Sequence, residues 1–262
     1  MFVVLECCAS ANRTLSLAEL VERTGFPKST LHRLCWKLVE LGALDSGDQG
    51  FVVGTKLFAL GSMSPQLRRM RAMSMPYMHD LVVRTGWVAN LAVLSDGRAL
   101  VAEEVYGAAP PLPKVMGSSV PLHASAVGKA LLAGTPPDER DALLAALRLP
   151  PLTAHTIVRE AQLREQLAEI ERTGIATSRQ EYRMGTSAVA SPVIVDGRVL
   201  AALALIGPHH EASLRPHGQA VRSGASRLAK ALARPPLPRR PDLPAARAVR
   251  NADAQPPLTS GN

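Results

Sequence analysis

The first fifty residues show the apolar spacing of three short helices. Apolar residues dominate from 2 to 9, and Ser16 with Glu19 three positions later forms a capping box that predicts a second helix over 16–23. Gly25 ends that helix, and a longer amphipathic helix begins at about Pro27. Its inward apolar positions follow helical spacing: Leu31, Leu34, Cys35, Leu38 and Leu41. Two helices joined by a turn of about four residues predict a helix-turn-helix.

A hairpin and a further helix are expected next. Ala43-Leu44-Asp45 and Phe51-Val52-Val53 flank a polar turn, which predicts a β-hairpin, or wing, directly after the long helix. Helical spacing then extends from 55 to about 73. Because proline lacks a backbone N–H, Pro76 is expected to interrupt or restart this helix. We therefore expect a domain boundary near residues 62–74.

The second part of the chain predicts an antiparallel sheet. Asp96-Gly97 and Asp196-Gly197 are tight-turn sequences between runs rich in Val, Ala and Leu. The expected strands cover 87–94, 99–106, 187–195 and 198–205. The expected helices cover 125–133, 137–147, 160–173 and about 216–234. Hairpins separated by helices indicate an α+β fold with helices packed on one sheet.

These patterns divide the chain into four expected parts. They are a winged helix-turn-helix over 1–61, a linker helix region over 62–74, the α+β domain over 75–234 and a tail over 235–262. The tail is rich in Pro, Ala and Arg and has no period, so we expect it to be disordered.

Composition narrows the class of protein. The net charge is +8, and residues 1–72 hold nine Lys or Arg against six Asp or Glu, so the first part favours an anionic partner. No apolar run reaches the ~18 residues of a membrane span, and we expect a cytoplasmic protein without a membrane partner. Cys7, Cys8 and Cys35 lack metal or disulfide spacing and are expected to be reduced core residues, with a Cys7–Cys8 redox switch as the alternative.

The polar face of the long helix is a candidate for reading DNA. Its outward side chains are Lys28, Ser29, Thr30, His32, Arg33, Trp36 and Lys37. First-turn residues would enter the major groove, and Arg33 would contact a guanine or a phosphate. The alternative is a merely solvated polar face, but the capped helix before it and the wing after it favour DNA binding. Trp36 is expected to pack against the first helix or a partner subunit rather than to stack near the duplex.

Three segments resemble the IclR family of regulators. They are LSLAELVERTGFPKSTLHRLCWKLVELG at 15–42, PLHASAVGKALLAG at 121–134 and RQEYRMGTSAVASPVIVDGRVLAALALIGP at 179–208, in family order and spacing. The resemblance covers about residues 3–232. It implies a GAF-like effector-binding domain, a homodimer or dimer of dimers, palindromic double-stranded operator DNA beside catabolic genes, and neither enzymatic activity nor a cofactor. Met1 falls almost inside the first helix, so we expect either an upstream start or a first helix that is one turn short.

The resemblance also implies where a small-molecule effector binds. By position, the effector pocket would be lined by Ser125, Ala126, Val127, Ser178, Ala188, Ala204 and Ile206. Family members that bind small oxoacids tend to carry Asp, Cys and Ser at several of these positions. Here Ala188, Ala204 and Ile206 remove hydrogen-bonding groups, and an unpaired buried carboxylate is costly. We therefore expect a larger or more apolar effector, with aromatic acids fitting best.

Rival interpretations depend on single features. His123 and Ser125 lack a nucleophile elbow, and Gly128-Lys129 lacks the first glycine of a phosphate loop, so hydrolase chemistry is not expected and Lys129 should cap or flank a helix. His209 and His210 lack further metal ligands and predict a surface loop, not a metal site. The stronger rival is a protein-interaction module whose winged helix binds protein without sequence-specific DNA binding.

Overall fold

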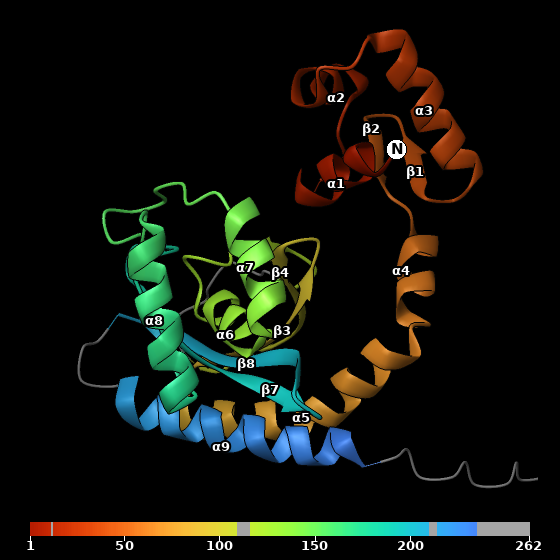
Figure 1. The fold of residues 1–262 in the computed structure, drawn as a ribbon. Helices are drawn as coiled ribbons and strands as arrows, with labels where there is room; N and C mark the ends of the chain where they lie inside the picture. The colour runs from red at the N-terminus through yellow and green to blue at the C-terminus, as the bar shows by residue number, and fades with distance from the viewer. Residues whose placement is uncertain (12, 109–115, 210–213, 235–262) are drawn as a thin grey trace, which may run out of the picture.

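The computed structural model describes residues 1–11, 13–108, 116–209 and 214–234, and the expected tail lies outside this range. A small helical unit stands apart from a larger domain in which helices cover a sheet (Figure 1). Two helices, α4 (Thr55–Ser62) and α5 (Pro65–Thr85), connect the two bodies. The predicted α+β fold is confirmed.

The first unit is the predicted winged helix-turn-helix. It contains α1 (Phe2–Ala11), α2 (Leu17–Thr24), α3 (Lys28–Glu40), β1 (Leu44–Gly47) and β2 (Gly50–Val53). The capping box is present: Ser16 accepts from the Glu19 N–H at 3.3 Å, and the Glu19 carboxylate accepts from the Ser16 N–H at 2.9 Å. Gly25 ends α2 in the left-handed region, with φ 69°, where a side chain would be strained. The sequence therefore defines both ends of the turn between α2 and α3.

The expectation that Pro76 interrupts the linker helix is wrong. α5 runs without a break from Pro65 to Thr85, with Pro76 inside it. Met70 and Met78, on either side of the proline, are buried in the core of the larger domain. Their packing holds the helix together although one backbone hydrogen bond is lost, at a typical cost of ~3 kcal/mol. The break in the connector lies instead at residues 63–64, between α4 and α5.

The larger domain is built on an antiparallel six-stranded sheet in the order β5-β4-β3-β8-β7-β6. The strands are β3 (Val88–Ser95), β4 (Arg98–Val105), β5 (Ser119–Val120), β6 (Ala176–Arg179), β7 (Thr186–Val195) and β8 (Arg198–Pro208). Both Asp-Gly turns are confirmed, with positive φ at Asp96, Gly97, Asp196 and Gly197. The short strands β5 and β6 were not predicted.

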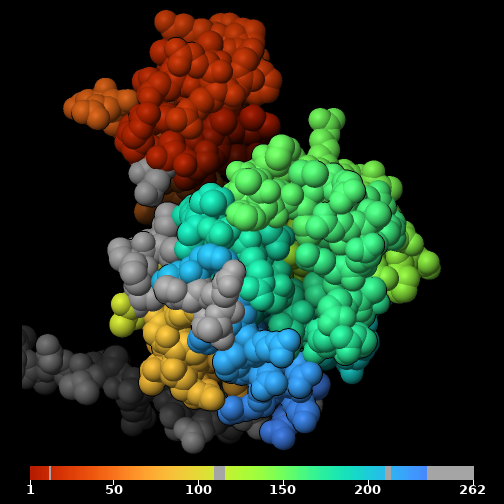
Figure 2. Space-filling model, turned by 90° about the vertical axis from the view of Figure 1, so that its left-hand side faces the viewer, coloured from red at the N-terminus to blue at the C-terminus, as the bar shows by residue number. Residues whose placement is uncertain are grey.

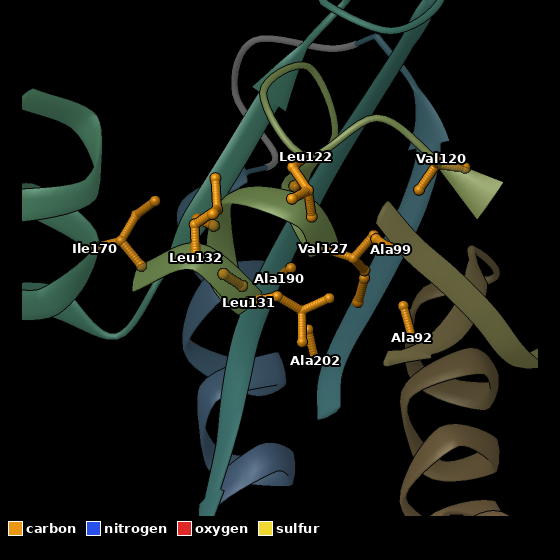
Figure 3. Close-up of a cluster of buried hydrophobic side chains, with 14 of the residues drawn as sticks. Ala92, Ala99, Val120, Leu122, Val127, Leu131, Leu132, Ile170, Ala190 and Ala202 are labelled. Carbon is orange, nitrogen blue, oxygen red and sulfur yellow. The ribbon is translucent and has the colours of Figure 1, made fainter. Parts of the chain in front are cut away.

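Helices cover both faces of this sheet. They are α6 (Ala126–Gly134), α7 (Pro137–Ala146), α8 (Glu160–Thr173) and α9 (Leu214–Ala233). α5 and α9 pack on one face, and α6 lies on the other with α8 beside it (Figure 1). Beneath α6 the strands carry alanines, including Ala92, Ala190 and Ala202, so Leu131 and Leu132 of the helix approach the sheet closely (Figure 3). This core fills the space under the later turns of α6.

Candidate nucleic-acid interface and ligand cavity

The polar face of α3 is solvent-accessible, as the sequence predicts. Leu31, Cys35 and Leu38 are buried against the rest of the unit. Of the candidate DNA contacts, Lys28, Ser29, His32, Arg33 and Lys37 are exposed and Thr30 is half-buried. The unit stands at one end of the molecule, above the larger domain (Figure 2). α3 thus presents a cationic face that a duplex could reach.

Two of these residues have local partners. The Lys37 ammonium lies 2.8 Å from the Glu40 carboxylate, which raises the pKa of Lys37. His32 accepts a hydrogen bond from the Trp36 indole at 3.0 Å. Trp36 packs edge-on against His32 of α3 at 6.2 Å and against Phe51 of the wing at 6.0 Å between ring centroids, so its observed ring contacts lie on α3 and β2 and not on the first helix. Trp36 therefore fixes the wing against α3.

The seven candidate effector residues line one cavity of the larger domain. The cavity encloses about 700 Å³, including open space at its mouth, and lies between the first turn of α6 and the sheet. Ser125, Ala126 and Val127 come from the start of α6, and Ser178, Ala188, Ala204 and Ile206 from β6, β7 and β8. Residues that are far apart in sequence are thus brought together as the resemblance implies.

The two serines of this set are occupied by backbone groups. Ser125 Oγ donates to the Pro121 carbonyl at 2.6 Å and accepts from the Gly128 N–H at 3.1 Å. Ser178 Oγ donates to the Ala124 carbonyl at 2.9 Å. Both hydroxyl protons are therefore used to hold the start of α6 against β6. Of the N–H groups in the first turn of α6, that of Gly128 is capped by Ser125, whereas those of Ala126 and Val127 have no acceptor within the helix.

Further lining residues escaped the sequence reasoning. They are Val88, Asn90, Val101, Glu104, Val120, Tyr182, Arg183 and Thr186. Glu104 accepts from the Tyr106 hydroxyl and from the Met116 N–H, and the Asn90 amide, oriented with its nitrogen toward acceptors, donates to Glu104 at 3.3 Å. Burial and the Glu104 carboxylate raise the pKa of Tyr106, which keeps its hydroxyl a donor. Arg183 is half-buried in the loop between β6 and β7. From the sequence, the polar and charged residues of this lining set could have been recognised only as polar residues at inward positions of an otherwise apolar pattern.

Behind the cavity lies a buried ion pair, and the expectation that Lys129 caps or flanks its helix is wrong. Lys129 is fully buried, and its Nζ lies 2.7 and 2.8 Å from the two Glu181 oxygens and 2.7 Å from Gln166 Oε1. Three acceptors match the three protons of an ammonium group. Burial lowers the pKa of Lys129, and Glu181 opposes that shift. The pair ties α6 to the loop that carries Tyr182 and Arg183.

The histidines that the structure describes do not assemble a hydrolytic or metal site. His123 is buried, with Nε2 3.1 Å from the Pro150 carbonyl, and burial lowers its pKa. It is not bonded to Ser125, whose hydroxyl is held by backbone. His209 Nδ1 lies 2.7 Å from Ser187 Oγ, while His210 lies outside the described residues. Within the described ranges no group of three His, Cys, Asp or Glu could hold a metal ion.

Two remaining features are the state of the cysteines and the length and polarity of the helices. All three cysteines are free thiols in the structure, and burial raises the pKa of Cys8 to about 11. Cys8 and Cys35 belong to the core of the first unit, with Cys7 at its edge. Across the part of the chain that the structure covers, no helix has the length and apolar character to span a membrane.

Comparison with known proteins identifies relatives for both bodies. The family descriptions "IclR helix-turn-helix domain" and "Bacterial transcriptional regulator IclR C-terminal" match residues 1–46 and 66–229. The chain is 32% identical over 216 residues to the acetate operon repressor of Salmonella typhimurium, covering 78% of this chain and 77% of the repressor. It is 31% identical over 216 residues to the transcriptional repressor IclR of Escherichia coli, with coverage of 78% and 77%.

Solved structures show the same fold. The crystal structure of an IclR homolog from Microbacterium hydrocarbonoxydans, complexed with 4-hydroxybenzoate, matches with a TM-score of 0.77 and 26% identity. The match covers 88% of this chain and 96% of that one. The similarity therefore includes both the winged unit and the sheet domain.

Proposed function

Since the chain belongs to the IclR family of bacterial transcriptional regulators, we propose that α3 and the wing bind double-stranded operator DNA and that a small organic acid in the cavity alters this binding. The relatives are DNA-binding regulators and not enzymes, which sets the class of function. Regulation of a catabolic operon in the cytoplasm, through a homodimer or dimer of dimers, belongs to the same proposal.

The observation that carries the DNA interface is the exposed cationic face of α3. Lys28 stands at its first position and Arg33 lies on the same exposed face. An arginine that contacts a guanine in two places contributes ~1–3 kcal/mol, and each lost phosphate contact lowers the salt slope by ~0.9. The rival protein-interaction module predicts no dependence of DNA affinity on these two residues.

The test replaces both residues and measures DNA binding. Mobility shifts on the intergenic DNA beside the gene, over a salt series, should show at least ~10-fold weaker binding for Lys28→Ala/Arg33→Ala. A matched control, Arg164→Ala/Arg172→Ala, removes two positive charges from α8 and should bind normally. If both variants bind like the wild type, the interaction module is favoured instead.

The effector class follows from the lining of the cavity. Ala126, Val127, Ala188, Ala204 and Ile206 form apolar walls, and Arg183 adds one cation. The homolog from Microbacterium hydrocarbonoxydans holds 4-hydroxybenzoate, an aromatic acid. We expect aromatic carboxylic acids to bind, with the carboxylate at Arg183 and the first turn of α6. Calorimetric titration that found tight binding of glyoxylate or pyruvate, and none of aromatic acids, would overturn this assignment.

The dimer proposal rests on apolar side chains left in water. Phe2 on α1 is 78% exposed, and Phe58 and Leu60 on α4 are 76% and 57% exposed. Large apolar side chains exposed on both α1 and α4 make these helices candidates for an interaction surface. A second copy of the chain would cover them and would place two α3 helices on a two-fold operator. Sedimentation velocity that gave a monomer at micromolar concentration would contradict this.

The domain division is likewise a proposal. The break at residues 63–64 falls within the expected linker region of 62–74, whereas Met70 already packs in the core of the larger domain. We propose that 1–61 forms the DNA-binding unit and 75–234 the effector-binding domain, with the start of α5 shared between linker and core.

A further inference from the structure

A large aromatic side chain stands at the edge of the exposed face of α3. Trp36 is 44% exposed, and its ring packs edge-on against Phe51 of β2, with the two ring planes at 84°. Phe51 is buried in the core of the winged unit, and its backbone is bonded to that of Leu15 in both directions, at 2.8 and 2.9 Å. The core of the unit therefore holds Trp36 in place, although much of its surface is in water.

The indole of Trp36 determines which ring nitrogen of His32 carries the hydrogen. Trp36 Nε1–H donates to His32 Nε2 at 3.0 Å. An indole nitrogen can only donate, so Nε2 must be the unprotonated nitrogen of the imidazole. An uncharged imidazole has a single N–H, and the bond made by one ring nitrogen fixes the state of the other. The hydrogen of His32 therefore lies on Nδ1.

The Nδ1–H group is left for a partner outside the chain. Among the residues that the structure describes, His32 Nδ1 has no hydrogen-bond partner. His32 is exposed, one turn after Lys28 and next to Arg33. A duplex presents acceptors to such a side chain, namely phosphate oxygens and the purine N7, guanine O6 and thymine O4 atoms of the major groove. The opposite tautomer would present an acceptor instead and would favour the amino groups of adenine or cytosine.

We propose that Trp36 is a positioning residue that holds His32 as the Nδ1–H tautomer, so that α3 offers an uncharged hydrogen-bond donor to an acceptor on the operator. This inference rests on the proposed function and deepens it, because it states what His32 contributes beside the cations of α3. An uncharged donor releases no counterion from the duplex, whereas Lys28 and Arg33 do. His32 therefore adds affinity that does not depend on salt.

The first measurement reads the tautomer without DNA. A long-range proton–nitrogen correlation spectrum of the full chain with labelled histidine is recorded at about pH 8, where an ordinary imidazole is uncharged. The nitrogen coupled to both ring C–H protons, Nε2, should show the chemical shift of an unprotonated nitrogen in His32, whose signal is identified by its loss in His32→Ala. In Trp36→Phe, which keeps an aromatic ring beside Phe51 but lacks the N–H, this signature should weaken. A protonated Nε2 in the wild type would overturn the proposal.

The second measurement is a double-mutant cycle on operator affinity, by mobility shift on the intergenic DNA. His32→Ala should bind about threefold to tenfold more weakly, the worth of one uncharged hydrogen bond, and Trp36→Phe about twofold or more. The double variant should lose no more than His32→Ala alone, because Trp36 acts through His32. Losses that add would show that Trp36 acts on the DNA or the wing by itself, and an unchanged affinity in Trp36→Phe would equally overturn its positioning role. His32→Asn, whose amide nitrogen can take the place of Nδ1, should recover most of the loss.

A matched control and the salt series complete the design. His79→Ala removes an exposed histidine from α5 and should bind like the wild type. A loss in His32→Ala that is equal on operator and unrelated duplex indicates a phosphate acceptor, whereas a loss confined to the operator indicates a base edge. In both cases the salt slope should stay unchanged, and a slope reduced by about 0.9 would mean that His32 acts as a cation, against the proposal. Thermal melting reports folding, and if Trp36→Phe does not fold, the wild-type tautomer and the recovery in His32→Asn still decide.

The outcomes separate this inference from the proposed function. Normal operator binding by Lys28→Ala/Arg33→Ala would overturn DNA binding through α3, whatever the tautomer of His32. Loss of binding in that variant, together with normal binding by His32→Ala, would overturn the present inference and leave the proposed function standing.

Discussion

Replacing Lys129 by methionine should destabilise the effector-binding domain severely. The ammonium is fully buried and holds three acceptors, the two Glu181 oxygens and Gln166 Oε1, at 2.7–2.8 Å. Methionine approximates the volume of lysine but donates nothing, so the Glu181 carboxylate, which is 5% exposed, keeps only weaker partners. Breaking a buried pair by removing one partner typically costs ~3–5 kcal/mol, which is a large share of the ~5–15 kcal/mol that stabilises a domain.

The assay is urea denaturation followed by circular dichroism, arranged as a double-mutant cycle. We compare Lys129→Met, Glu181→Leu and the double variant, and read the transition of the larger domain. The double variant leaves no buried charge unpaired, so it should recover most of the loss. Lys56→Met, at an exposed position on α4, is the matched control and should change stability by less than ~0.5 kcal/mol.

Two results would refute this reasoning. A loss below ~1 kcal/mol for Lys129→Met would mean that water or a rearrangement satisfies Glu181, in conflict with the observed burial. A double variant that loses the sum of the two single losses would show that the partners act separately. Lys129→Met should also bind ring acids more weakly, although Lys129 does not line the cavity. Its partner Glu181 directly precedes the lining residues Tyr182 and Arg183.

Two further predictions test other buried features. Burial holds the pKa of His123 below its ordinary value. Below pH ~6.5 the unfolded chain therefore binds more protons than the folded one, and the stability falls as the pH falls. In His123→Gln the urea midpoint should therefore fall less between pH 7 and pH 5 than it does in the wild type. Gly50→Ala should destabilise the winged unit by more than ~1 kcal/mol, because Gly50 has φ 129° and a Cβ there would lie 2.1 Å from the Leu15 carbonyl oxygen. Gly47→Ala on the adjacent strand, where a Cβ meets nothing within 4 Å, should melt almost normally.

Local signals carried most of what the sequence predicted. The capping box at Ser16 and Glu19, the left-handed Gly25 and the two Asp-Gly turns each act within a few residues, so they can be recognised without a structure. The four long strands follow from their composition for the same reason. β5 is two residues long and pairs with β4 across a long connection, and so short a segment has no period to detect.

Long-range contacts account for what the sequence could not reveal. Lys129 and Glu181 are 52 residues apart, and only the folded sheet brings them together. The same holds for Glu104 and Arg183, which are remote in sequence and meet one cavity. At Pro76 the local preference against proline inside a helix was outweighed, because the helix buries methionines on both sides of the proline. The sequence places Trp36 against the first helix or a partner subunit, whereas within the chain its ring contacts His32 of α3 and Phe51 of the wing.

The connection between cavity and DNA unit follows from the position of α5. β3 presents Val88 and Asn90 to the cavity, while Ala89 and Leu91, on its opposite face, pack in the core that α5 and α9 share. α5 leads into β3 through Gly86 and Trp87, and its 21 residues extend from that junction to the break at 63–64. A helix of this length spans ~32 Å and moves as a stiff body. A ligand shifts DNA affinity only by its unequal affinity for two arrangements of the protein. We therefore expect that a ligand-dependent shift of β3 would pass through α5 to the break at residues 63–64 beside α4, where the winged unit is attached.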